Sequence, residues 1–239
     1  LGDVYKRQQL GDAAEVMAGI TRKQGIRYAA LTPNMRGYED ARKARMDEVA
    51  VFGAATQSFS KKNINCSIPE SLARFRPVVA AALQDGIAAR GYISVVVHCP
   101  YEGKVAPLAV LEMAEALLEM GCYEISLGDT TGHATPETVS ALLDVLVPRL
   151  NPDILVGHFH DTRNRAIENV MTCLDYGLRK FDSSVGGLGG CPFAPGAKGN
   201  VSTSLLHDAL VAAGWHTGLD RAALRKSEEL VTKMGLKPR

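Results

Sequence analysis

Residues 123–160 read YEISLGDTTGHATPETVSALLDVLVPRLNPDILVGHFH, and this stretch decides the fold. It begins with a short apolar run at Tyr123–Leu127, continues with a helical pattern over Thr135–Val147, and ends with a second apolar run at Ile154–Phe159. A strand, a helix and a second strand in that order predict two parallel strands joined by a crossover helix. Polar side chains follow both apolar runs, so the stretch also indicates where a site lies.

The same alternation continues on both sides of this stretch. Further strands are predicted at Ile26–Leu31, Glu48–Gly53, Tyr92–Cys99 and Lys180–Val185, and further helices at Gly37–Ala44, Ile68–Arg90, Ala106–Met120 and Asn164–Tyr176. Alternating strands and helices predict an α/β fold with parallel strands and helices outside them. After Asn200 the pattern predicts helices alone, at Ser204–Ala213 and Asp220–Met234.

The ends of the strands favour a barrel over an open sheet. Polar residues follow strand after strand, which is typical of a TIM barrel, whose site is built from the loops after its strands. A doubly wound sheet normally has a glycine-rich phosphate loop after its first strand, and the sequence shows none. About six strand–helix units are visible, whereas a closed barrel has eight. We therefore expect an incomplete TIM (β/α)8 barrel that lacks the first two strands and has extra C-terminal helices.

The composition is that of an ordinary globular chain and excludes several function classes. The 239 residues carry 27 basic and 26 acidic side chains without a basic stripe, so we expect neither nucleic acid nor a membrane surface as a partner. No apolar run approaches the ~20 residues of a membrane span, and no secretory signal is visible. The five cysteines are scattered, which indicates reduced thiols, and we expect a cytoplasmic location.

The end of the quoted stretch and a later glycine-rich segment suggest one active site. His158 and His160 are two residues apart at a strand end, so their imidazoles share one face and can reach one metal ion. Residues 183–200, SSVGGLGGCPFAPGAKGN, carry the thiol of Cys191 and end in the amide of Asn200. This combination predicts metal-assisted chemistry on a small substrate.

These two segments and five others resemble the hydroxymethylglutaryl-CoA lyase family of metal-dependent TIM barrels. The other five are Leu31–Asn34, Phe52–Thr56, Lys61–Ser67, Cys99–Gly103 and Ser126–Thr130. The resemblance begins near Gln9, and the glycine-rich Cys loop is its most specific element. It implies retro-Claisen cleavage of an acyl-CoA substrate, 3-hydroxy-3-methylglutaryl-CoA, to acetoacetate and acetyl-CoA, as in leucine degradation. A homodimer is left open as the assembly.

The resemblance implies that His158, His160 and Asn200 bind the metal. Nitrogen and oxygen ligands with open positions for substrate suit Mg²⁺ or Mn²⁺. Cys191 is implied to be catalytic, as a proton donor or relay beside the enolate, on a glycine-rich flap that closes over substrate. The simpler alternatives are a pair of hydrogen-bonded core histidines and an unreactive buried thiol. Two inward imidazoles without a cation would be costly to bury.

Four further residues have both a possible role at the site and a simpler alternative. Asp129 resembles a family acid/base residue, but an Asp at a strand end also caps the following turn. Tyr101 is implied to be catalytic and to contact substrate, or it packs at the rim. Asn34 contacts the pantetheine arm or shapes its turn. Asp161 orients an imidazole or caps the next helix.

The start of the chain departs from the family pattern. Relatives carry an adjacent Arg-Asp pair on the first barrel strand, whose Asp binds the metal, and neither of the first two strands is found. We expect residues 1–8 to be a non-native leader and residues 9–239 to be one partial barrel domain, a weak or inactive catalyst. Ser204 stands where relatives often carry a Glu, which bears on proton handling or substrate choice.

Three competing functions stay open. A zinc hydrolase barrel also uses a His-x-His strand, but it draws further histidines from later strands, whereas the later strand ends of this chain offer only Asn200. A synthase of related chemistry would need lid or regulatory regions that the sequence does not show. A non-catalytic barrel fragment is the expectation if the chain binds no metal.

Overall fold

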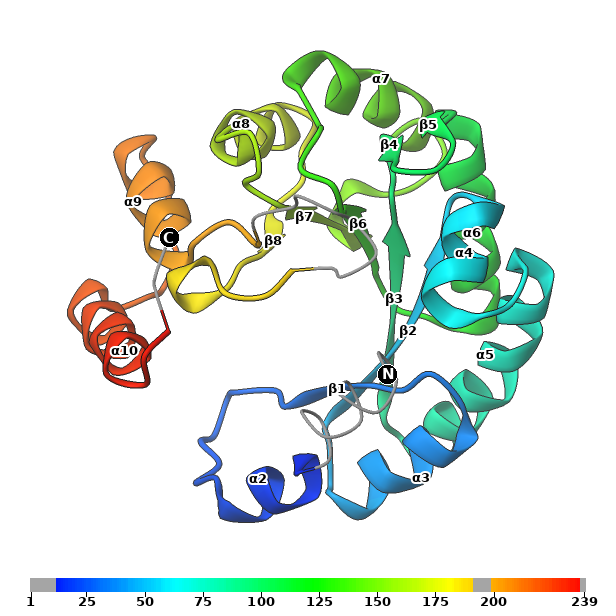
Figure 1. The fold of residues 1–239 in the computed structure, drawn as a ribbon, viewed down its shortest axis with the longest axis horizontal. Helices are drawn as coiled ribbons and strands as arrows, with labels where there is room; N and C mark the ends of the chain where they lie inside the picture. The colour runs from blue at the N-terminus through cyan, green and yellow to red at the C-terminus, as the bar shows by residue number, and fades with distance from the viewer. Residues whose placement is uncertain (1–11, 191–198, 237–239) are drawn as a thin grey trace.

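A computed structural model describes residues 12–190 and 199–236 of the chain. At its centre is a curled sheet of six strands in the order β1-β2-β3-β6-β7-β8, with every neighbouring pair parallel (Figure 1). The strands are β1 (Ala29–Leu31), β2 (Glu48–Ala54), β3 (Ala88–Ser94), β6 (Ile125–Asp129), β7 (Leu155–Phe159) and β8 (Lys180–Asp182). A separate antiparallel hairpin of β4 (His98–Cys99) and β5 (Gly103–Lys104) follows β3.

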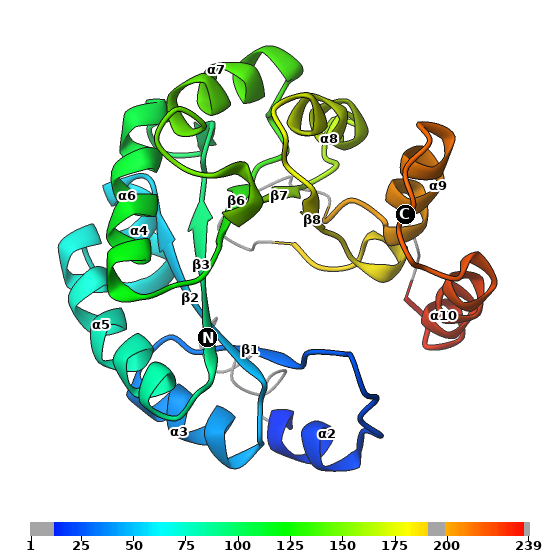
Figure 2. The same ribbon diagram turned by 180° about the vertical axis from the view of Figure 1, so that it is seen from behind.

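Helices cover one side of this sheet. They are α2 (Ala13–Gly19), α3 (Met35–Lys43), α4 (Gln57–Ile64), α5 (Ile68–Gln84), α6 (Pro107–Met120), α7 (Pro136–Leu146), α8 (Ala166–Asp175), α9 (Thr203–Ala212) and α10 (Arg221–Lys233), with short 3-10 turns η1 (Pro152–Ile154) and η2 (Val185–Gly187). Helices α3 and α5–α8 line the outer side of the sheet, while α9 and α10 lie beyond β8 (Figures 1 and 2). The curled parallel sheet, outer helices and C-terminal helices confirm the predicted α/β architecture.

Two predicted boundaries were wrong. The helix predicted over Ile68–Arg90 ends at Gln84, because Gly86 adopts a left-handed φ of 71° and the backbone then enters β3. The strand predicted over Tyr92–Cys99 is interrupted after Ser94, where Val95 has a φ of 58°. The prediction also missed α2, α4 and the β4–β5 hairpin, which are short elements.

The core lies between the sheet and its outer helices. Buried strand side chains meet buried helix side chains there, among them Val51, Ile93, Ile125, Leu155, Leu117 and Leu143. Gly91 of β3 lets α6 approach closely, because a Cβ there would lie 3.0 Å from Ile125 Cδ1 and 3.1 Å from Leu117 Cδ1. The outer face of the sheet is therefore filled by core side chains, and a site can form only on the inner face.

The inner face carries polar side chains. Tyr92 pairs in register with Ser126, Gly128 with His158, and His158 with Asp182. Residues in register share a face in a parallel sheet, and alternate residues return to it. Arg90, Ser126, His158 and Asp182 thus line one concave surface. No helix in the described ranges is long and apolar enough to cross a membrane.

Candidate active site

His158, at the end of β7, is held by a carboxylate of the neighbouring strand. Its Nδ1 lies 2.9 Å from Oδ2 of Asp182. Burial alone would raise the pKa of Asp182, but the hydrogen bond with His158, the positive charge of Arg90 and the hydroxyl of Ser126 lower it below its usual value. An ionised carboxylate only accepts hydrogen bonds, so the proton of His158 resides on Nδ1. In the neutral form of this ring, Nε2 is then the nitrogen with the lone pair.

Asp182 is itself fixed by two other strands. Arg90 of β3 donates from Nη2 to Oδ1 at 2.9 Å, and Ser126 of β6 donates to Oδ2 at 2.8 Å. Arg90 also pairs with Glu124 at 2.9 Å and stacks over the Tyr92 ring at 4.8 Å. This cluster is largely buried, since the side chain of Arg90 is 12% exposed and that of Asp182 20%.

His160 follows β7 in a different environment. It is buried, and its Nδ1 has no hydrogen-bond partner among the described residues. Burial, together with repulsion from His158, lowers the pKa of His160 to about 4, so its ring is neutral at pH 7. The two imidazole centroids are 5.7 Å apart. Two adjacent imidazoles, one of them with an unsatisfied buried nitrogen, are a ligand set that suits a divalent cation.

Asn200 lies beside His160. The two residues form an isolated antiparallel bridge, and the backbone of Val201 donates to Phe159 O at 3.0 Å. The side-chain Nδ2 of Asn200 donates to Leu188 O at 2.9 Å. Asn200 and Val201 therefore lie against the end of β7, and the third predicted ligand is next to His160. Cys191 lies outside the described residues, and its catalytic role stays a prediction.

Asp129 is buried at the end of β6, within the following turn. It pairs in register with Phe159, a core residue, so it does not share the face of His158. Its Oδ1 accepts from His133 N at 3.1 Å and its Oδ2 from Ala134 N at 3.0 Å. Burial raises the pKa of Asp129 to about 6 despite these hydrogen bonds. The carboxylate clearly stabilises this turn, and its acid/base role stays a prediction.

The two predicted substrate contacts lie on other loops. Asn34 follows β1 and is the N-cap of α3, its Oδ1 accepting from Gly37 N at 3.0 Å. Tyr101 lies in the β4–β5 hairpin with its ring 6.2 Å from that of Phe59. Asp161 caps α8 by accepting from Ala166 N at 3.0 Å. These contacts support the simpler alternative for Asp161 and give Asn34 a structural role.

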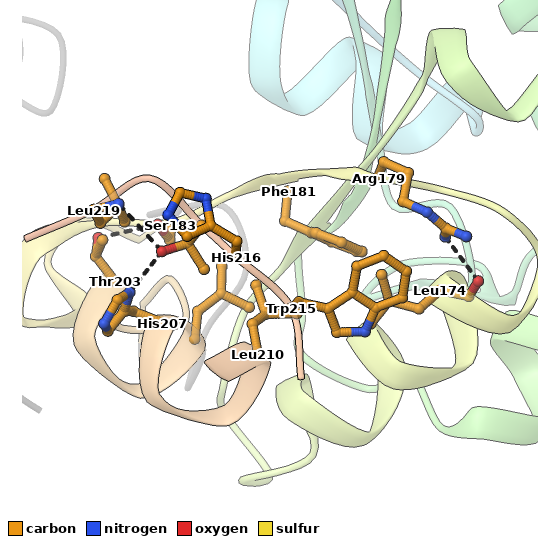
Figure 3. Close-up of a pocket in the computed structure, with 12 residues that line it drawn as sticks. Leu174, Arg179, Phe181, Ser183, Thr203, His207, Leu210, Trp215, His216 and Leu219 are labelled. Atoms are coloured by element: carbon orange, nitrogen blue, oxygen red, sulfur yellow. Dashed lines mark hydrogen bonds between the residues drawn. The ribbon is translucent and has the colours of Figure 1, made fainter. Parts of the chain in front are cut away.

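A cavity of about 250 Å³ lies away from the paired imidazoles, between β8, α8 and α9 (Figure 3). Trp215 and Phe181 form part of its lining, together with Ser183, Thr203 and His207. The guanidinium of Arg179 lies 4.6 Å from the centre of the Trp215 ring. None of the three predicted metal ligands lines it, so we assign it no part in the chemistry below.

A family model described as HMGL-like matches residues 8–231. The chain belongs to the HMGL-like family. It is 47% identical over 225 residues to the cytoplasmic 3-hydroxy-3-methylglutaryl-CoA lyase of Mus musculus. The matched region covers 94% of this chain and 66% of that protein. It is 49% identical over 216 residues to the hydroxymethylglutaryl-CoA lyase of Pseudomonas mevalonii, covering 90% and 72%. The HMGL-like chain thus spans about two thirds of the length of such curated relatives.

Solved structures agree with this membership. The HMG-CoA lyase from Brucella melitensis matches with a TM-score of 0.92 and 53% identity, covering 95% of this chain and 80% of that one. An HMG-CoA lyase from Acinetobacter baumannii, in complex with coenzyme A and 3-methylmalate, matches with a TM-score of 0.90 and 35% identity, covering 95% and 74%. The predicted family resemblance is confirmed.

Asp182, Arg90 and Ser126 of this HMGL-like chain were not predicted as site residues. A signal was present, because Lys180, Asp182 and Ser184 alternate along one predicted strand and so share a face. What the sequence could not supply was the register that sets Asp182 beside His158.

Proposed function

We propose that the chain is a metal-dependent carbon–carbon lyase that cleaves 3-hydroxy-3-methylglutaryl-CoA to acetoacetate and acetyl-CoA. The observation that carries the proposal is the pair of adjacent imidazoles, His158 and His160, with Asn200 bridged to the second of them. Family membership supports the same chemistry, since the relatives described above are named as lyases of this substrate.

His158, His160 and Asn200 would hold Mg²⁺ or Mn²⁺. Two nitrogens and an amide oxygen fit such a cation, and the orphaned Nδ1 of His160 marks a buried polar position that lacks a protein partner in the described residues. When bound, the cation would supply charge that favours the ionised tertiary hydroxyl of the substrate.

The remaining task of the protein is to move protons. The hydroxyl of the substrate loses its proton, the C–C bond breaks with its electrons passing to the acetyl-CoA enolate, and the enolate carbon gains a proton. Asp129 is the proposed acid/base group, and its pKa of about 6 suits proton transfer near neutral pH. Its two oxygens accept from the backbone N–H groups of His133 and Ala134, which hold the carboxylate in place. Cys191 is the proposed proton donor to the enolate, and Tyr101 and Asn34 are proposed to contact substrate.

The substrate class extends to related 3-hydroxyglutaryl-CoA thioesters. A relative from Pseudomonas aeruginosa, 48% identical over 216 residues, is named 3-hydroxy-3-isohexenylglutaryl-CoA/hydroxymethylglutaryl-CoA lyase. Ser204 is a reason to test both thioesters, because the resemblance places a Glu there in many relatives. A cytoplasmic location and a homodimer complete the proposal, the first because the Mus musculus, Rattus norvegicus and Homo sapiens relatives are named cytoplasmic.

The deciding experiment measures acetoacetate release from 3-hydroxy-3-methylglutaryl-CoA with and without Mg²⁺. We expect cation-dependent release that is lost in the His158→Ala and His160→Ala variants. The matched control is His207→Ala, because His207 lines the separate cavity beside α9. If the folded wild-type chain neither releases acetoacetate nor binds Mn²⁺, the proposal is refuted and the non-catalytic alternative is favoured.

A further inference from the structure

We propose that Asp182 is a positioning residue that selects the Nδ1–H tautomer of His158 and so presents the Nε2 lone pair to the cation. Arg90 and Ser126 hold the carboxylate in the orientation that this role requires. The inference rests on the proposed function and names the groups that prepare one of its ligands.

The hydrogen bonds of Asp182 have fixed directions. Oδ1 of Asp182 accepts from Arg90, and Oδ2 accepts from both Ser126 and His158, at 2.8–2.9 Å. The donors come from β3, β6 and β7, so three separate strands fix the rotation of one carboxylate on β8. Neither Arg90 nor an ionised Asp182 can reverse its role, which leaves His158 as a donor through Nδ1.

Ion pairs surround the carboxylate of Asp182. Arg90 and Lys180 are cations, and Asp182 and Glu124 are anions, linked by contacts of 2.7–2.9 Å. A neutral ring that donates to a carboxylate is a stronger metal ligand than a free imidazole, because the carboxylate raises the basicity of the other nitrogen.

The two histidines differ in their surroundings. Among the described residues, His160 has no carboxylate partner and its Nδ1 is unpaired, whereas His158 is anchored from three strands through Asp182. The two ligands are therefore not equivalent. Asp182 should matter for cation binding even though it contacts neither His160 nor Asn200 in any described hydrogen bond.

A purely structural role is the alternative, in which Asp182 and Arg90 tie β8 to β3. Glu124 provides the matched control, because it pairs with the same Arg90 and with Lys180 but has no described contact with an imidazole. The Glu124→Gln variant disturbs the ion-pair network and spares the tautomer.

The test combines two measurements on the folded chain. Long-range ¹H–¹⁵N NMR of metal-free protein reports which ring nitrogen of His158 carries the proton, and Mn²⁺ titration followed by electron paramagnetic resonance reports affinity. In Asp182→Asn, the amide must turn its NH₂ away from Arg90 and toward His158, so we expect the tautomer to switch to Nε2–H. Mn²⁺ affinity should then fall by about 10- to 100-fold, while Glu124→Gln should keep both the tautomer and an affinity close to that of the wild type.

The role of Asp182 and the proposed lyase function can be refuted separately. A wild-type His158 with its proton on Nε2, or an Asp182→Asn variant that keeps the wild-type tautomer and Mn²⁺ affinity, would overturn the role of Asp182. A wild type with the Nδ1–H tautomer that binds no Mn²⁺ would instead count against the proposed lyase function. The wild-type tautomer is measurable even if Asp182→Asn fails to fold.

Discussion

Gly189 offers the sharpest test of the position of Asn200. Its φ is 92°, and a Cβ added there would lie 2.7 Å from Nδ2 of Asn200, closer than real Cβ contacts allow. Gly189→Ala must therefore displace either the loop or the Asn200 amide, which now donates to Leu188 O. Because the proposed cation binding by Asn200 requires the native amide position, the substitution should weaken binding.

The magnitude follows from two contributions that can be separated. The left-handed φ costs about 1–2 kcal/mol for any residue with a Cβ. The steric contact adds about 1–3 kcal/mol, as overpacking does elsewhere. If Mn²⁺ binding requires the Asn200 amide to return to its native position, the steric cost lowers the binding free energy. The Kd for Mn²⁺ should then be about 5- to 150-fold weaker.

Gly218→Ala is the matched control. Gly218 has a comparable φ of 72° and no atom within 4 Å of an added Cβ. It should lose stability in urea unfolding but bind Mn²⁺ like the wild type, as titration followed by electron paramagnetic resonance will show. Wild-type affinity in a folded Gly189→Ala protein would refute the placement of Asn200 in the cation site.

Three further predictions concern stability. Asp129 has a folded pKa of about 6 against an ordinary value of 3.8, so the folded chain binds the proton more tightly and its unfolding free energy should fall as pH rises from about 4 to 6. This contribution is up to about 3 kcal/mol, and urea unfolding across that range should show the slope disappear in Asp129→Asn. Arg179→Ala should shift the emission of Trp215, the only tryptophan, to longer wavelength and cost about 0.5–1 kcal/mol, because the guanidinium covers the indole at 4.6 Å; unchanged emission would contradict the stacking. Ser204→Ala removes the hydroxyl that donates to Glu228, so the opening free energy measured by hydrogen exchange in α10 should fall by about 1 kcal/mol. Glu229→Gln, in an exposed pair with Arg225, should leave this free energy unchanged.

Much of the site could be predicted because it depends on local pattern. The spacing of His158 and His160 puts both on one strand face by the two-residue period alone. Asp129 and Asn34 were expected at strand ends and lie there, and the turn-capping alternative for each depended only on neighbouring backbone N–H groups. Helix ends were less predictable, as the wrong boundary at Arg90 shows. Helix propensity predicted a helix up to Arg90, but Ala88–Arg90 pair with β2 as part of β3.

The sequence by itself determined the order of strands and helices, the paired imidazoles and the family, since each is encoded in periodicity or a short motif. Only the tertiary structure decided which nitrogen of His158 is free and that His160 is unsatisfied. Both depend on parallel register, which sets Asp182 of β8 beside His158 of β7 and lets Arg90 reach across from β3. Register joins residues 24 to 92 positions apart, and no local pattern records such distances.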